Sequence, residues 1–318
     1  MIVGAVCLSH SPLKDSNAPP PDTGRRFNQA LEQMADFVSG AEPDLTIVFY
    51  PDHLNGFFYQ MLPPFCVGIE GTSVGDYGTA SGKLDIPEDR ATDLARSVLL
   101  SGVDTALSHD MQVDHGAIQP LEWLSTTFPL FRMIPIFVNC AAPPLPTFQR
   151  VRALGQAVGD WARQAPERIL IIGSGGLSHD PPMPSLAGAA PQVRERLVKG
   201  TPLPHGQRFA RQSKAQLEGQ AMEAGKSRLR AINPEWDQTL LDAFVAGDLT
   251  VLDGTSDDSI REAGGRGGGE ARAWIAALST LGENYSATQI YYEPVQSWIT
   301  GMGMLLATAN EDQSLTDI

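Results

Sequence analysis

Short apolar segments that alternate with amphipathic segments are the feature that most limits how this 318-residue chain can fold. Four segments are continuous apolar or β-branched runs, typical of strands buried on both faces: 2–8, 44–50, 133–139 and 167–173. Three intervening segments repeat apolar residues at helical spacing: 23–39, 88–101 and 146–164. This alternation predicts an α/β fold, with a mostly parallel or mixed sheet that carries helices on both faces.

The remaining elements give weaker signals. A weak strand is expected at 104–109, a short helix at 117–127, and a strand at 287–294. Two polar helices are expected at 206–226 and 234–247, whereas 298–309 suits a helix or a buried strand equally. Loops are expected at 181–192 and 263–270. No repeat or long linker divides the chain, so residues 1–318 are predicted to form a single domain, with 310–318 as a frayed tail.

Charge and cysteine content exclude several classes of protein. The chain has 23 Lys+Arg against 37 Asp+Glu, a net charge of −14, and shows no basic stripe, which argues against binding to nucleic acid. No apolar run reaches the roughly 18 residues of a membrane helix, and the N-terminus lacks the basic start of a signal peptide. Cys7, Cys66 and Cys140 form no CxxC pair, so neither a disulfide framework nor a thiolate zinc site is expected. These features predict a protein of the reducing cytoplasm, without a membrane partner.

Four of the six histidines follow predicted strands or weak strands: His10, His53, His115 and His179. In open α/β sheets, ligands bind beyond the carboxyl ends of the strands. Imidazole is the commonest metal ligand and the usual general base near neutral pH. The pattern therefore predicts a histidine-rich active site at one edge of the sheet, whereas the other two histidines are expected to be ordinary.

The residue types allow more than one metal. Two histidines and one carboxylate leave three coordination positions open, as in non-haem Fe(II) oxygen chemistry, and Zn²⁺ can use the same ligands. Asp52, Asp114 and Asp180 are next to histidines, and adjacent residues of an extended chain point apart, so these are expected to be supporting or surface groups. Glu270 follows a glycine-rich segment and opens a helix, and the pattern alone favours a surface position for it. Spacing does not select the ligands.

Five motifs then occur in one order along the chain: SHSP at 9–12, PDHLNGFFY at 51–59, MLPPFC at 61–66, MQVDHGAIQPLE at 111–122 and GSGGLSHDPP at 173–182. Together they resemble the class III extradiol ring-cleavage dioxygenases, and the likeness covers nearly the whole chain. The resemblance implies a three-layer α/β/α sandwich that forms a single catalytic domain over 1–318. It also implies a homo-oligomer, such as a tetramer or a larger assembly.

The resemblance assigns roles that spacing does not. It implies Fe(2+) held by His10, His53 and Glu270, with His115 as proton donor and His179 as proton acceptor. The implied substrates are O₂ and a catechol, either 3-(2,3-dihydroxyphenyl)propionate or 2,3-dihydroxycinnamate. The product would be a 2-hydroxy-6-oxo-dienedioic acid, formed in bacterial aromatic catabolism. An anionic substrate tail also requires an arginine or lysine in the site, which the sequence does not identify.

Three alternatives stay open at this point. The same chemistry can act on another 3-substituted catechol. A Zn²⁺ hydrolase can use the same ligands, but it would leave one of His115 and His179 without a function. A non-catalytic relative can retain the fold, but it would not need both of those histidines.

Overall fold

The central layer is an eight-stranded mixed sheet. Its strands, in chain order, are β1 (Ile2–Leu8), β2 (Leu45–Tyr50), β3 (Phe65–Gly68), β6 (Ala106–Ser108), β8 (Met133–Val138), β9 (Ile169–Ser174), β10 (Tyr285–Val295) and β11 (Thr300–Ala309). The computed structural model describes residues 1–125, 132–200, 203 and 205–310, and its strands follow the order β10-β11-β1-β9-β2-β8-β3-β6. β1, β9, β2 and β8 run parallel to one another, whereas β11 and β3 are antiparallel to β1 and β8.

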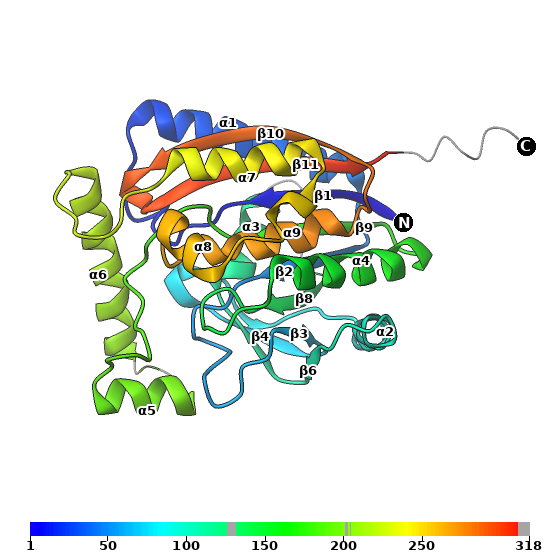
Figure 1. The fold of residues 1–318 in the computed structure, drawn as a ribbon, viewed down its shortest axis with the longest axis horizontal. Coiled ribbons are helices and arrows are strands. Elements are labelled where there is room, and N and C mark those ends of the chain that lie inside the picture. Colours follow the sequence, from blue (N-terminus) through cyan, green and yellow to red (C-terminus); the bar gives the residue numbers. More distant parts are fainter. Residues whose placement is uncertain (126–131, 201–202, 204, 311–318) are drawn as a thin grey trace, which may run out of the picture.

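Helices cover both faces of this sheet (Figure 1). Successive side chains of a strand point to opposite faces, and the residues of β1 divide accordingly: Ala5 and Cys7 join one apolar core, Val6 and Leu8 the other. The first core includes α2 (Glu88–Leu100), α4 (Phe148–Gln164), α7 (Pro234–Ala246) and α9 (Ala271–Ser279). The second includes α1 (Pro21–Ala41) and α3 (His115–Leu124). The predicted three-layer α/β/α sandwich is therefore confirmed.

Several short elements were not predicted. They are β3 of the main sheet, the strands β4 (Gly71–Val74), β5 (Ser81–Lys83) and β7 (Met111–Val113) of a second sheet, the helices α5 (Pro191–Lys199) and α8 (Asp257–Gly264), and the 3-10 turns η1 (Asp76–Gly78), η2 (Leu249–Leu252), η3 (Gly268–Glu270) and η4 (Gln296–Trp298). Segments of this length carry too few residues to show a hydrophobic period.

The structure also settles the ambiguous segment at 298–309. Residues 300–309 form β11, because this apolar run lies between β1 and β10 and pairs with both, whereas Trp298 ends η4. In the predicted helix at 117–127, residues 117–124 belong to α3, whereas 126 and 127 lie outside the described residues. Residues 311–318 of the predicted frayed tail also lie outside them.

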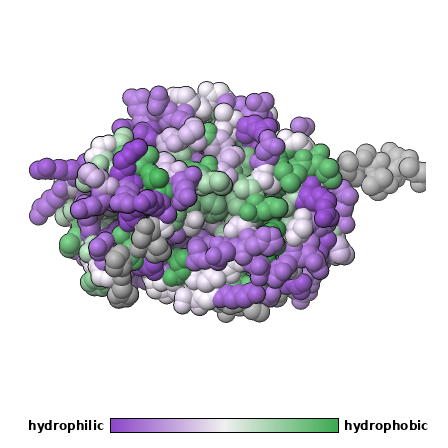
Figure 2. Space-filling model, turned by 90° about the horizontal axis from the view of Figure 1, so that it is seen from below, coloured by the Kyte–Doolittle hydropathy of each residue, from purple (hydrophilic) through white to green (hydrophobic). Residues whose placement is uncertain are grey.

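One helix stands apart from the layers. α6 (His205–Glu223) lies at one end of the sheet in Figure 1, with α5 beside its lower end. This is the end at which β1, β9 and β2 finish, so α6 crosses the edge where the sequence predicts the active site. The face in Figure 2 is mostly hydrophilic, with apolar residues in small groups. Among the described residues, no helix has the length and apolar character needed to span a membrane.

Candidate active site

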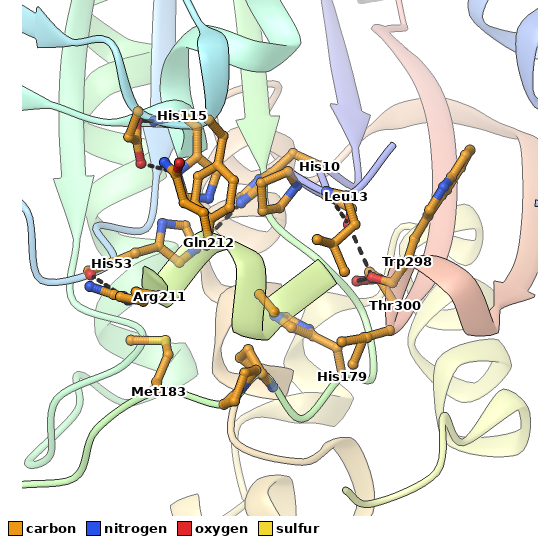
Figure 3. Close-up of a pocket in the computed structure, with 18 of the residues that line it drawn as sticks. His10, Leu13, His53, His115, His179, Met183, Arg211, Gln212, Trp298 and Thr300 are labelled. Atoms are coloured by element: carbon orange, nitrogen blue, oxygen red, sulfur yellow. Dashed lines mark hydrogen bonds and ion pairs between the residues drawn. The ribbon is translucent and has the colours of Figure 1, made fainter. Parts of the chain in front are cut away.

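Three neighbouring parallel strands deliver three of the four predicted histidines. β1, β9 and β2 lie side by side, and His10, His179 and His53 follow their carboxyl ends. Together with His115 they line one pocket (Figure 3). The rule that open α/β sheets bind ligands beyond the carboxyl ends of strands thus holds here.

The other two predicted residues reach the same place from different elements. His115 is the first residue of α3, whose N-cap Asp114 accepts a hydrogen bond from the Gly116 N–H. Glu270 is the last residue of η3 and directly precedes α9, and only 3% of its surface is exposed. The surface position that the pattern alone favoured for Glu270 is therefore wrong. The reason is that α9 is buried along its whole length, which draws its first turn into the protein.

The donor atoms of three of these residues converge. The two Nε2 atoms of His10 and His53 lie 3.4 Å apart, and His53 Nε2 lies 3.5 Å from Glu270 Oε1. The other carboxylate oxygen, Glu270 Oε2, accepts a hydrogen bond of 2.7 Å from the Gly176 N–H. A Cβ on Gly175 would lie 2.8 Å from the Glu270 carbonyl oxygen, so this close approach requires glycine.

Hydrogen bonds behind the imidazoles decide which nitrogen faces the pocket. Ser174 Oγ donates to the Gly116 carbonyl, so it accepts from His10 Nδ1, which lies 2.9 Å away. His53 Nδ1 donates to Asp114 Oδ2 at 3.0 Å. In the neutral form of each ring, Nε2 is then the nitrogen that carries the lone pair, as a metal ligand requires, and partners of this kind orient ligating histidines in metal sites generally.

The remaining two histidines have equally defined partners. His115 Nδ1 lies 2.5 Å from Asp76 Oδ2, and the His115 backbone N–H donates to Asp76 Oδ1. His179 Nδ1 donates to the Leu177 carbonyl at 3.0 Å, and His179 Nε2 lies 3.1 Å from Glu270 Oε1. Sequence reasoning missed Asp76, because it sits in a short turn far from any histidine along the chain and no local pattern marks it.

Burial and neighbouring charges set the protonation of the cluster. Burial, with His53 and His115 adding to it, lowers the pKa of His10 to about 3. Burial alone would lower the pKa of His53, but Asp114 and Glu270 outweigh it and raise that pKa well above its usual value. Burial would also lower the pKa of His179, but the Glu270 carboxylate outweighs burial and raises it. Burial would raise the pKa of Glu270, but the His179 imidazole and its neighbours outweigh burial and hold that pKa well below its usual range.

The carboxylates next to histidines have supporting positions, as predicted. Asp114 is fully buried and holds His53, whereas Asp52 accepts backbone N–H groups of the loop at 55–57. Burial, then the Asp114 charge, raises the pKa of Asp52 to about 7. Asp180 pairs with Arg266. Of the two histidines expected to be ordinary, His109 has a side chain that is 70% exposed, and residue 205 begins α6.

The donor set fits a metal ion. His10, His53 and His115 offer nitrogen atoms within 4.8 Å of one another, and Glu270 adds an anionic oxygen beside His53. A second group, Asp76, Asp114 and His115, is equally tight. The atoms of that second group are already engaged in the hydrogen bonds to His53 and His115, so it is better described as a supporting network. The residues present can therefore hold a metal through two imidazoles and either a carboxylate or a third imidazole.

Known proteins resemble this chain over almost its full length. The family model of the catalytic LigB subunit of aromatic ring-opening dioxygenase matches residues 4–303. A protein of Paraburkholderia xenovorans is 44% identical over 307 residues, which cover 95% of this chain and 96% of that protein. Relatives from Cupriavidus pinatubonensis and Photorhabdus laumondii are each 42% identical, over 95% and 96% of this chain and 96% and 98% of their own. All three are named 2,3-dihydroxyphenylpropionate/2,3-dihydroxicinnamic acid 1,2-dioxygenase.

These matches agree with the resemblance carried by the five motifs, and they decide against a hydrolase or a non-catalytic protein. An aromatic ring-opening dioxygenase takes a small aromatic molecule and O₂ as substrates. The chain belongs to the LigB family of aromatic ring-opening dioxygenases, and it is an extradiol dioxygenase.

Proposed function

We propose that the chain is an Fe(II)-dependent enzyme that cleaves 3-(2,3-dihydroxyphenyl)propionate or 2,3-dihydroxycinnamate with O₂ in bacterial aromatic catabolism. One observation carries the proposal: four buried histidines line a single pocket with Glu270 directly behind them. The relatives named for these two substrates, at 42–44% identity over 95–96% of this chain, support the choice of substrate.

His10, His53 and Glu270 would hold the iron. Two imidazoles and one carboxylate on one face of an octahedron are the donor set of non-haem Fe(II) oxygenases, whereas three imidazoles are more typical of zinc. When bound, Fe(II) supplies a site at which a catechol and O₂ are held side by side and through which electrons pass between them. The partners of both Nδ1 atoms support this assignment, because each Nδ1 proton is donated to the group behind the ring and Nε2 is left as the nitrogen that can bind a metal.

His179 would accept a proton from the substrate. Its Nδ1–H donates to the Leu177 carbonyl, so Nε2 is the basic nitrogen when the imidazole is neutral. That atom faces Glu270 Oε1 at 3.1 Å, beside the donors that would hold the metal. A catechol hydroxyl bound beside Glu270 would lie near this nitrogen, which would accept its proton once Glu270 is engaged by the metal.

His115 would donate the proton that ring cleavage needs. Asp76 engages Nδ1, so Nε2 is the atom that can carry a proton toward the pocket. His115 also stacks on His53, with ring centroids 4.3 Å apart, and this contact fixes the orientation of its ring. The two Nδ1 atoms thus have different partners, a neutral carbonyl for His179 and a carboxylate for His115. This difference suits His179 for accepting a proton and His115 for donating one.

Anaerobic reconstitution tests the proposal. Metal-free protein is loaded with Fe(II) and a reductant, mixed with 3-(2,3-dihydroxyphenyl)propionate, and exposed to air. We expect oxygen uptake and a yellow hydroxy-oxo-dienedioic acid, and neither from protein loaded with Zn²⁺. No product with iron verifiably bound would refute this substrate, and a panel of other 3-substituted catechols would then locate the preferred ring substituent.

Three further features are proposed with this function. The described residues from both ends of the chain pair in one sheet through β1 and β11, which supports residues 1–318 as one catalytic domain. Cys7, Cys66 and Cys140 are buried free thiols, which suits the reducing cytoplasm. The homo-oligomer rests on the resemblance to the family, and light scattering on the purified protein tests it, with a monomer mass as the contrary outcome.

A further inference from the structure

One face of α6 forms a wall of the active-site pocket. Its pocket-lining residues are Arg208, Arg211, Gln212 and Ala215, at the spacing of neighbours on one side of a helix. Figure 3 shows Arg211 and Gln212 beside His53 and His115. This helix, which the sequence predicts to be polar, therefore turns two guanidinium groups toward the substrate space.

Both guanidinium groups lack an acidic partner. Within the described residues no salt bridge includes either of them, and they donate to main-chain carbonyls: Arg211 Nη2 to His53 O at 3.2 Å, and Arg208 Nη1 to Val74 O at 3.4 Å. Other arginines, such as Arg90, are paired with carboxylates. A guanidinium has five N–H donors, so both groups keep most of theirs available.

A third cation adjoins the pair. Arg196 and Arg208 line a neighbouring hollow together, and burial, with the Arg211 charge adding to it, lowers the pKa of Arg196. Three neighbouring positive groups are unusual in a chain whose net charge is −14. Like charges that face one another repel, and an anion bound between them removes that repulsion.

We propose that Arg211, assisted by Arg208, binds the carboxylate of the substrate side chain and so selects catechols with an anionic tail. This inference rests on the proposed function and adds the residue that recognises the tail. Arg211 donates to the main-chain carbonyl of His53, so its guanidinium lies near the side chains that would hold the metal and, through it, the catechol. A planar guanidinium matches a carboxylate through two parallel hydrogen bonds.

Paired substrates test the assignment. The kcat/KM of the Fe(II)-loaded enzyme is measured for 3-(2,3-dihydroxyphenyl)propionate and for its uncharged amide, in the unmodified protein and in Arg211→Gln, Arg211→Lys and Arg208→Gln. We expect Arg211→Gln to lower the carboxylate-to-amide ratio of kcat/KM by about 10- to 100-fold. Arg208→Gln lowers it less, and Arg211→Lys restores part of it because the charge is kept.

Arg194→Gln is the matched control. Arg194 is an exposed arginine of α5 outside the pocket, and its replacement removes the same charge. We expect it to leave the ratio and the rate unchanged. Higher salt should also raise the KM of the carboxylate more than that of the amide, and this difference should vanish in Arg211→Gln.

The outcomes separate the two proposals. Equal losses for both substrates in Arg211→Gln would make Arg211 a merely structural partner of the His53 loop and overturn the inference. A selective loss in Arg208→Gln alone would overturn the assignment to Arg211. If the unmodified protein cleaves neither substrate, the proposed function fails. If it cleaves the carboxylate and the uncharged amide equally well, only the present inference is refuted.

Discussion

Asp76 and His115 form a buried pair in which the carboxylate Oδ2 lies 2.5 Å from imidazole Nδ1 and Oδ1 accepts the His115 backbone N–H. The two residues come from η1 and α3, so the pair joins two elements that are separate in the chain. A carboxylate bound in this way selects the tautomer and fixes the ring plane of a histidine. The pair therefore determines which nitrogen of His115 can exchange a proton with the substrate.

Replacing Asp76 by asparagine tests this relationship. The amide can donate as well as accept, so it no longer holds the proton at Nδ1. We expect kcat to fall by about 10- to 100-fold, with iron content unchanged and KM changed by less than about twofold. Asp110→Asn is the control, because Asp110 is an exposed aspartate on the approach to the same helix. Loss of bound iron, or an unchanged kcat, would contradict a role in orienting His115.

Metal content distinguishes the proposed ligands from the proposed acid and base. We expect His10→Ala, His53→Ala and Glu270→Ala to lose bound iron, because each removes one of three donors. His115→Ala and His179→Ala should keep about one equivalent of iron while ring cleavage is lost. Iron is measured by atomic emission after anaerobic loading and desalting.

The same experiment addresses the third imidazole of the cluster. His115 has a ring nitrogen within 4.8 Å of those of His10 and His53, so geometry alone allows a three-histidine site. Iron lost from His115→Ala but kept by Glu270→Ala would assign the third ligand to His115. Equal loss from all five variants would show that the division of roles is wrong.

The sequence predicted the parts of this site that depend on strong local signals. His10, His53 and His179 follow apolar strands that are easy to recognise, and the sheet brings their carboxyl ends together. It could not predict the burial of Glu270, which depends on how α9 packs and on the close approach of Gly175. Those two features involve contacts between distant segments.

Arg211 and Asp76 were missed for a related reason. A helix with many polar residues has no local feature that separates a charge facing solvent from one facing a pocket, and the position of α6 at the sheet edge decides this for Arg211. Asp76 lies in a turn of three residues, and only the fold brings that turn to His115. The five motifs did identify the family, because they preserve the surroundings of each histidine.

The loop after His179 provides a test of pH dependence. Asp180 accepts hydrogen bonds from Arg266 Nε at 2.6 Å and from the Arg230 backbone N–H at 3.2 Å. Burial alone would raise the pKa of Asp180, but Arg266 outweighs it and holds that pKa below its usual value. A lowered pKa in the folded state means that the ionised pair stabilises the fold near neutral pH, and that this contribution is lost as the pH falls through the folded pKa.

We expect Asp180→Asn to lower the free energy of unfolding by about 1 kcal/mol at pH 7, a small value because the Arg266 side chain is 38% exposed. The deficit should persist down to about pH 5 and shrink below about pH 4, as the pH falls from the ordinary aspartate pKa of the unfolded chain toward the lowered pKa of folded Asp180. Urea unfolding of both proteins between pH 3 and 7 measures this. Asp36→Asn, at an exposed position of α1, should show no deficit, and a deficit in Asp180→Asn that grows in acid would contradict the assignment.

Gly267 tests whether His179 must occupy its observed position. A Cβ at this residue would overlap the His179 imidazole, although the backbone of Gly267, with φ of −86°, suits any residue. Gly267→Ala therefore acts through the displaced ring and not through backbone strain. Displacement of a catalytic group by about 1 Å can cost about 100-fold in rate, so we expect kcat to fall by about 10- to 100-fold while bound iron is retained.

Gly254→Ala is the matched control, because a Cβ there meets no atom within 4 Å. We expect its kcat to be unchanged and its free energy of unfolding to stay within about 0.5 kcal/mol of the unmodified protein. Calorimetry on both variants separates displacement of His179 from general loss of structure. A Gly267→Ala protein with full activity would show that the imidazole can move aside at no cost, and His179 would then not be the positioned proton acceptor.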